Sequence, residues 1–193
     1  MAMVDAGAVA TTTLHRTPDQ ILGPFYPVQQ EPVTDGDLTE GGRAAGTVLH
    51  LSGRVLTSAG TPVAGARVEV WQANARGRYA HPNDTNPTPL DPHFAGFAVT
   101  ATDQEGRYRF KTVIPAAYPA GPDRMRPAHI HFKVTGRREQ LVTQMYFVGE
   151  EWNDRDPWLQ SARRKEALIV DPHDMPGESG AKAVTFDVVL AQG

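Results

Sequence analysis

Cysteine is absent from the 193-residue sequence. This absence excludes disulfide bonds, zinc–thiolate sites and thiol nucleophiles, so any bound metal must take nitrogen and oxygen ligands. Long apolar runs are also lacking, because no stretch reaches the ~18 apolar residues that a membrane-spanning helix needs. Residues 1–13 have neither the charged start nor the continuous apolar centre of a secretory signal. These absences predict a cytoplasmic protein without a membrane partner.

A strong excess of charge is lacking as well, since the formal net charge is -3 at pH 7. No long basic run provides the electrostatic surface that binds phosphates. The short basic cluster at residues 163–165 is more simply explained as solvated surface. We therefore expect no nucleic-acid partner.

The composition favours short strands over long helices, with 18 Gly, 16 Pro and 40% hydrophobic residues. Alternating apolar and polar residues predict strands over residues 48–56, 66–71, 98–102, 107–113, 129–135, 141–148 and 183–190. Residues 156–167 could form one short helix. Strands at this spacing predict an all-β sandwich, in which the first two strands pair as a hairpin around the turn at 58–62.

The chain divides into an N-terminal arm, residues 1–46, and a β-sandwich domain, residues 47–193. Residues 1–13 are rich in Ala, Gly and Thr and are expected to be a disordered tail. The prolines of the segment 23–27 prevent it from joining a regular ladder, so the arm must pack on the core. Residues 74–97 lose periodicity, and such a long loop is usually functional or disordered.

One motif, residues 126–132, contains two histidines with one residue between them. If it is a strand, His129 and His131 point to the same face, and Ile130 and Phe132 point to the other. Same-face residues lie roughly 6.6 Å apart, which a metal ion can bridge after modest rotation of the rings. The motif alone leaves open whether the histidines bind a metal or lie on a solvent-facing strand.

Two tyrosines, Tyr79 and Tyr118, lie in irregular loops on either side of the expected strands. Taken singly, each is more simply a buried hydrogen-bonding residue. Together with His129 and His131 they form a hard nitrogen and oxygen ligand set with two negative charges. Such a set suits a trivalent, oxygen-seeking metal, for which ferric iron is the natural candidate.

With these motifs in order, the sequence resembles the intradiol ring-cleavage dioxygenases, the family of catechol and protocatechuate dioxygenases with non-haem iron(III). The resemblance runs from about residue 51 to the C-terminus. It is carried by residues 77–79, 90–96, 102–110, 115–119, 126–132, 143–147 and 186–190. It implies a prealbumin-like β-sandwich with long active-site loops and little helix. The implied reaction is cleavage of a catecholic substrate by O2 to a cis,cis-muconate-type diacid.

The same resemblance assigns roles to particular residues. One iron(III) per chain is expected to be bound by Tyr79, Tyr118, His129 and His131. Tyr118 is also expected to be catalytic, because in this family one tyrosinate leaves the metal as the catechol binds and can accept a substrate proton. Arg126 and Gln144 match positions that face the reacting ring and stabilise negative charge, with a surface ion pair and a strand-edge hydrogen bond as the alternatives. Tyr26 matches a segment that lines the substrate pocket, or it only fastens the arm to the core.

The branch of the family is less well defined by the sequence. The helical dimerisation region of the catechol and hydroxyquinol branches is absent, and the pair Tyr118 and Pro119 resembles the protocatechuate branch. However, Ala120 stands where that branch often has tryptophan. Hydroxyquinol or catechol 1,2-dioxygenase activity is therefore the alternative, and a non-catalytic β-sandwich binding module is the alternative of another class. We expect a homo-oligomer, with an assembly that includes a homologous partner subunit as the alternative.

Overall fold

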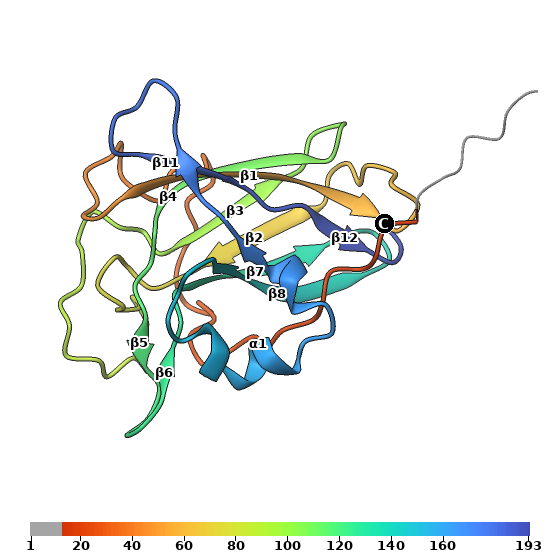
Figure 1. Cartoon of the computed structure of the whole chain (residues 1–193). Helices are drawn as coiled ribbons and strands as arrows, with labels where there is room; N and C mark the ends of the chain where they lie inside the picture. Colours follow the sequence, from red (N-terminus) through yellow and green to blue (C-terminus); the bar gives the residue numbers. More distant parts are fainter. Residues whose placement is uncertain (1–12) are drawn as a thin grey trace, which may run out of the picture.

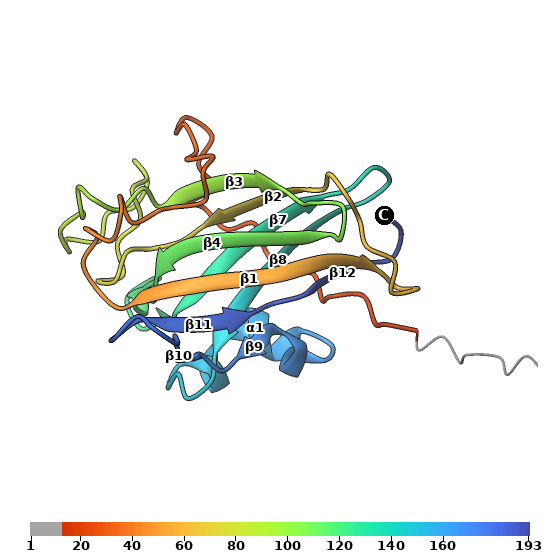
Figure 2. The same cartoon turned by 90° about the horizontal axis from the view of Figure 1, so that it is seen from above.

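The computed structural model describes residues 13–193, so the tail expected at the N-terminus lies outside the described residues except for Thr13. The strands form two five-stranded sheets and one small two-stranded sheet. The two large sheets pack face to face, as Figures 1 and 2 show from two directions. The expectation of an all-β sandwich with little helix is confirmed.

The first sheet is built around the long strand β1 (Val48–Thr57). On one side β1 pairs antiparallel with β4 (Arg107–Val113), and on the other it pairs parallel with β11 (Lys182–Thr185) and then with β12 (Val188–Leu190). The short strand β10 (His173–Asp174) pairs with β11. The single closing strand expected over 183–190 is thus two strands, separated at Phe186, whose N–H donates to the carbonyl oxygen of Ser52.

The second sheet has the order β3 (Phe97–Ala101), β2 (Arg67–Trp71), β7 (His129–Thr135), β8 (Gln140–Phe147) and β9 (Ile169–Val170). One face of this sheet packs on the first sheet through fully buried residues such as Val70, Ile130 and Phe132. The opposite face carries a separate buried cluster that includes Trp71, Tyr79 and Tyr118. The loops and the N-terminal arm cover this second face.

The predicted hairpin between β1 and β2 is wrong, because the two strands belong to different sheets. Both edges of β1 are occupied by β4, β11 and β12, so the chain crosses to the other sheet after the turn. Sequence alternation shows that a strand has one buried face, but it does not show which strand is its neighbour. The turn makes one isolated bridge, between Leu56 and Pro62.

The helix expected over 156–167 is shorter and broken. A 3₁₀ turn, η1 (Asn153–Arg155), precedes α1 (Pro157–Ser161), and a second 3₁₀ turn, η2 (Lys165–Leu168), follows Arg164 in the left-handed conformation. Asp156 begins α1, because its side chain accepts a hydrogen bond from the N–H of Leu159. No helix within residues 13–193 is long and apolar enough to cross a membrane.

The Pro-rich loop before β7 contains a two-stranded ribbon formed by β5 (Tyr118–Pro119) and β6 (Met125–Arg126). In Figure 1 this ribbon projects from the sandwich beside α1. The N-terminal arm runs along the second sheet, where the N–H of Gln20 donates to the carbonyl oxygen of Val142 at 2.9 Å. Further along the arm, Leu38 is fully buried in the main core.

Candidate metal centre

The register of the second sheet places a row of functional side chains on its outer face. His131 of β7 lies directly between Trp71 of β2 and Gln144 of β8. One step along, His129 lies opposite Tyr146 of β8. The alternation predicted from the sequence is therefore confirmed, since Ile130 and Phe132 face the core from the other side.

The two imidazole rings point their Nε2 atoms at each other, 3.0 Å apart. The Nδ1–H of His129 can donate to the carbonyl oxygen of Pro127 at 2.7 Å, which leaves the lone pair on Nε2. Burial and the charge of Arg126 hold the pKa of His129 well below its usual value, and burial, His129 and Arg126 do the same to the pKa of His131. Both rings are thus neutral and able to bind a metal.

The Nδ1 atom of His131 is buried and has no hydrogen-bond partner among residues 13–193, so packing positions that side of the ring. Its ring stacks on the indole of Trp71 with centroids 4.7 Å apart and planes at 8°. Gly23 of the arm also approaches the ring, so closely that a Cβ atom there would lie 3.2 Å from Cε1. The imidazole is therefore confined by Trp71 and by the backbone of the arm.

The two tyrosines enter the same cluster from irregular segments. The hydroxyl of Tyr79 lies 3.5 Å from Nε2 of His129. The rings of Tyr79 and Tyr118 meet edge to face with centroids 5.3 Å apart, and the ring of Tyr118 lies 5.7 Å from that of His129. Asp84 holds the Tyr79 loop by accepting a hydrogen bond from the N–H of Tyr79 at 2.7 Å.

The four side chains suit a hard, highly charged cation. Burial raises the pKa of Tyr79 well above 10 and also raises the pKa of Tyr118, so a strong positive charge is required to keep either residue as a phenolate. Two nitrogen donors about 2.1 Å from an ion and at a right angle would lie about 3.0 Å apart, which is the observed spacing of the imidazoles. Within residues 13–193 no group of three or more His, Asp or Glu side chains could bind a metal, so a metal here depends on the phenols.

A cavity of about 600 Å³ opens beside these residues. Tyr118 and Arg126 contribute polar groups to its wall, and Ile21, Phe25 and Trp158 contribute apolar ones. The volume lies within the range of small-molecule sites, and the mostly apolar lining is typical of them. A flat aromatic molecule could therefore reach Tyr118 without leaving the cavity.

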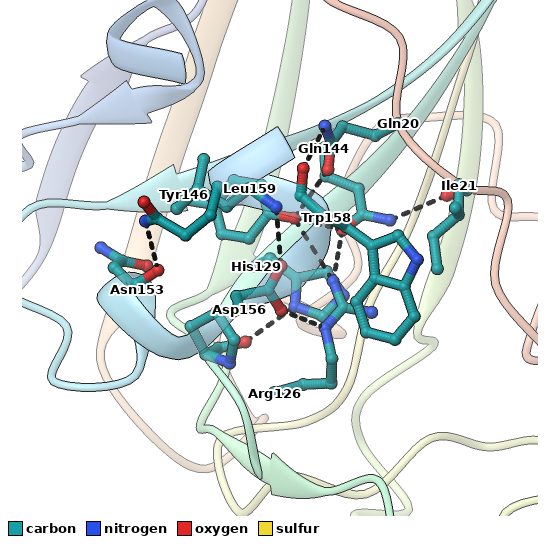
Figure 3. Close-up of polar contacts among 12 residues, drawn as sticks. Gln20, Ile21, Arg126, His129, Gln144, Tyr146, Asn153, Asp156, Trp158 and Leu159 are labelled. Atoms are coloured by element: carbon teal, nitrogen blue, oxygen red, sulfur yellow. Dashed lines mark hydrogen bonds and ion pairs between the residues drawn. The ribbon is translucent and has the colours of Figure 1, made fainter. Parts of the chain in front are cut away.

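Arg126 is buried at the wall of the cavity and is held by several polar contacts (Figure 3). Its Nε–H donates to Oδ2 of Asp156 at 2.6 Å, and its Nη2 donates to Oε1 of Gln144 at 2.7 Å. The amide nitrogen of Gln144 donates to the carbonyl oxygen of Ile21 at 2.8 Å. The structure thus brings Arg126 and Gln144 together beside the cluster of the two tyrosines and two histidines.

Tyr26 is the remaining site residue predicted from the sequence, and it packs on Trp71 outside the cavity wall. Its hydroxyl donates to Glu69 at 2.7 Å and accepts from Nζ of Lys133 at 2.9 Å, while its ring packs edge to face on Trp71. It is not among the residues that line the cavity, whereas its neighbour Phe25 is.

Sequence reasoning missed several residues of the site: Gln20, Phe25, Tyr146, Asp156 and Trp158. The helix expected from residue 156 does begin there, with Asp156 as its cap. The sequence did not reveal that the same carboxylate binds Arg126. Gln20 donates to the carbonyl oxygen of Trp158 at 3.2 Å and accepts from the hydroxyl of Tyr146 at 2.9 Å. No pattern in the sequence predicts either hydrogen bond.

Comparison with known proteins gives a consistent result. A family model described as "Dioxygenase" matches residues 21–192. The chain is 43% identical over 178 residues to the protocatechuate 3,4-dioxygenase beta chain of Burkholderia cepacia, covering 86% of this chain and 76% of that one. It is 32% identical over 196 residues to catechol 1,2-dioxygenase of Acinetobacter baylyi, covering 93% of this chain but only 61% of that enzyme.

Among solved structures, the chain resembles the dioxygenase domain of a dioxygenase–carbohydrate-binding fusion protein from Streptomyces sp. SirexAA-E. The TM-score is 0.73 at 28% identity, and the match covers 93% of this chain and 100% of that domain.

Proposed function

Because the chain belongs to the intradiol ring-cleavage dioxygenase family, we propose that it uses iron(III) and O2 to cleave a catecholic aromatic between its two hydroxylated carbons. The product is a cis,cis-muconate-type diacid. The observation that carries this proposal is the meeting of Tyr79, Tyr118, His129 and His131 in one buried cluster beside a cavity.

In this proposal the four clustered side chains hold one iron ion per chain through two imidazole nitrogens and two phenolate oxygens. Bound there, iron(III) supplies the electron-accepting centre that makes a catecholate reactive toward dioxygen. The charges support this choice, since two phenolates leave a trivalent ion with one net positive charge to attract a catecholate. Neutral imidazoles add no further charge.

The protein's own groups orient the substrate and manage its protons. The phenolate oxygen of Tyr118 takes one proton from the incoming catechol, since this residue lines the cavity and Tyr79 does not. Arg126 and Gln144 lie beside the same wall, where a fixed cation and an amide stabilise negative charge that develops on the ring. The apolar side chains of Ile21, Phe25 and Trp158 limit access of water.

For the substrate we propose a catechol of the protocatechuate branch, with catechol or hydroxyquinol as alternatives. The support is the 43% identity to a protocatechuate 3,4-dioxygenase beta chain, against 32% to a catechol 1,2-dioxygenase and 31% to the hydroxyquinol 1,2-dioxygenase of Nocardioides simplex. The term beta chain in that name also supports an oligomer, either of this chain alone or with a homologous partner. Light scattering of the purified chain tests whether it forms an oligomer by itself.

Oxygen uptake with product identification tests the reaction. The purified iron-loaded protein is given protocatechuate, catechol, hydroxyquinol and chlorocatechols in turn. We expect uptake of one O2 per ring opened and a muconate-type diacid with at least one of them. Iron-bound protein that opens none of these rings would contradict the proposed function and would favour a binding module.

A further inference from the structure

Asp156 is a buried carboxylate with no role in the function proposed above. Its side chain is fully buried, at the junction between η1 and α1. One oxygen, Oδ1, accepts a hydrogen bond from the N–H of Leu159 at 2.8 Å, and the other, Oδ2, accepts from Nε of Arg126 at 2.6 Å. The carboxylate therefore joins the start of the helix to the cation at the cavity wall (Figure 3).

The guanidinium of Arg126 is held from three directions. Asp156 binds its Nε side, and Gln144 and the hydroxyl of Tyr146 accept from Nη2 at 2.7 and 3.3 Å. Trp158, on the same helix that Asp156 begins, lies with its ring 4.4 Å from Cζ. Neighbours on two edges and one face leave the plane of the guanidinium little freedom to turn.

The remaining nitrogen, Nη1, donates to no residue among 13–193, and Arg126 contributes to the cavity wall. Its two N–H groups are therefore the donors left for a bound molecule. Their direction is fixed together with that of Nε and Nη2, because the guanidinium is planar and turns as one unit.

The ion pair is also isolated from water, since the side chains of Arg126 and Asp156 are 3% and 0% exposed. A buried charge that loses its partner is strongly destabilised, so Arg126 without Asp156 is driven to seek water or another anion. No other carboxylate contacts Arg126 within the described part of the chain.

We propose that Asp156 is a positioning residue that aims the Nη1 edge of Arg126 at the aromatic ring in the cavity. This inference rests on the proposed function, because it gives Arg126 a bound catechol to face. Asp156 acts on the bound ring only through Arg126. Because the same carboxylate begins α1, the orientation of Arg126 is linked to the position of Trp158 at the cavity wall.

The test compares Asp156→Ser with Arg126→Gln in the full-length, iron-loaded protein. Serine is a good first residue for a helix, so the contact to Leu159 is kept while the charge and its reach to Arg126 are lost. We expect iron content and the visible band of the resting protein to stay unchanged in both variants. Catechol affinity under nitrogen should change less than about threefold, while kcat falls about 100-fold. Glu139→Gln, which disturbs a different ion pair far from the cavity, should leave all of these values unchanged.

Two further measurements separate positioning from folding. Combining Asp156→Ser with Arg126→Gln should lower kcat no further than Arg126→Gln alone, because Asp156 acts through Arg126. The visible band of the catechol complex, formed under nitrogen, should shift in the same direction in both single variants. Where Asp156→Ser fails to fold, Asp156→Asn takes its place, since it keeps the size and the helix contact.

An unchanged kcat in Asp156→Ser, or additive losses in the double variant, would overturn the positioning role. Loss of iron and of the resting band in both Asp156 variants would overturn it as well, because the carboxylate would then be structural. A wild-type protein that binds catechol but opens no ring would instead contradict the proposed function, and the shift of the catechol band would still test the link between Asp156 and Arg126.

Discussion

The two histidines and the two tyrosines of the candidate metal centre are held in different ways. His129 and His131 stand on β7, which is paired along its length with β2 on one side and β8 on the other. Tyr79 stands in a loop without regular structure, and Tyr118 begins a two-residue strand. We call His129 and His131 the strand half of the site, and Tyr79 and Tyr118 the loop half. The strand half is fixed by many backbone hydrogen bonds, whereas the loop half is fixed by a few side chains and close contacts.

Because of this difference, the strand half should tolerate substitutions of its neighbours, whereas the loop half should not. A ladder distributes its energy over many residues, so no neighbour on β2 or β8 is by itself needed to orient β7. The loop half depends on single positions such as Asp84 and Gly77. Substitutions outside the four donor residues should therefore disturb the tyrosines more readily than the histidines.

Removing a donor from the strand half should have the largest effect. In His129→Ala we expect loss of iron binding and a fall in activity beyond the roughly 100-fold that loss of a supporting hydrogen bond causes. The β-sheet circular dichroism should persist, because the backbone pairing of β7 does not use the ring. Iron content and oxygen uptake measure the loss. His93→Ala, in a partly exposed loop, should retain both, and normal iron content in His129→Ala would contradict its role as a ligand.

Gly77→Ala should break the loop half while leaving the strand half intact. Gly77 has a positive φ of 80°, and a Cβ atom there would lie 2.5 Å from the carbonyl oxygen of Ala117 and 3.2 Å from Cβ of Tyr118. We expect the Tyr118 segment to move and iron affinity to fall at least about 10-fold. Gly60→Ala is the matched control, since its φ is 79° but nothing lies within 4 Å. Equal iron affinity in the two variants would contradict a role for the close contact at Gly77 in holding Tyr118.

Asp84→Ala should weaken the loop half less severely. Asp84 accepts from the N–H groups of Tyr79 and Asn86 at 2.7 and 2.8 Å, so its loss frees the Tyr79 loop. We expect iron affinity to fall by about 10-fold, the effect of losing a group that orients a metal-binding residue without touching the metal. Asp103→Ala removes the same kind of turn contact far from the site, where Asp103 accepts from Glu105 and Arg107. Both variants should melt at lower temperature, but only Asp84→Ala should release iron in a chelator titration.

Gly23→Ala should have the smallest effect of the four and tests the packing of His131. The added methyl group would lie 3.2 Å from Cε1 of the ring, a distance that a shift of a few tenths of an ångström can relieve. Because β7 is paired on both sides and keeps His131 in place, we expect iron to stay bound while the visible band shifts in wavelength. Gly60→Ala again controls for backbone strain. A band identical to that of the wild type would show that the arm does not confine the ring.

The sequence predicted the shared face of the two histidines, and the resemblance led to Tyr79 and Tyr118, which the structure places beside His129. Alternation placed His129 and His131 on one face, because the period of a strand depends only on local geometry. The polar network around Arg126 could not be predicted in this way. Asp156, Tyr146 and Gln20 come from three segments far apart in the chain, and their meeting depends on how the arm and α1 pack on the sheet.

The fold shows the same limit. The positions of most strands followed from alternation, but the partners of β1 did not, since pairing is a long-range property. The short strands β5, β6, β9 and β10 carry too few residues to give a periodic signal. Phe25 lines the cavity while Tyr26 packs behind it, and that choice between adjacent aromatics depends on the path of the arm.

The visible spectrum of the purified protein tests most directly whether the four side chains form one ferric site. Protein from iron-replete cells should be red-brown, with one iron per chain and a tyrosinate charge-transfer band that changes when catechol is added under nitrogen. Tyr79→Phe should bleach or displace this band, since it removes one of the two phenolates. A colourless, iron-free wild-type protein, or a Tyr79→Phe spectrum identical to that of the wild type, would contradict the assignment.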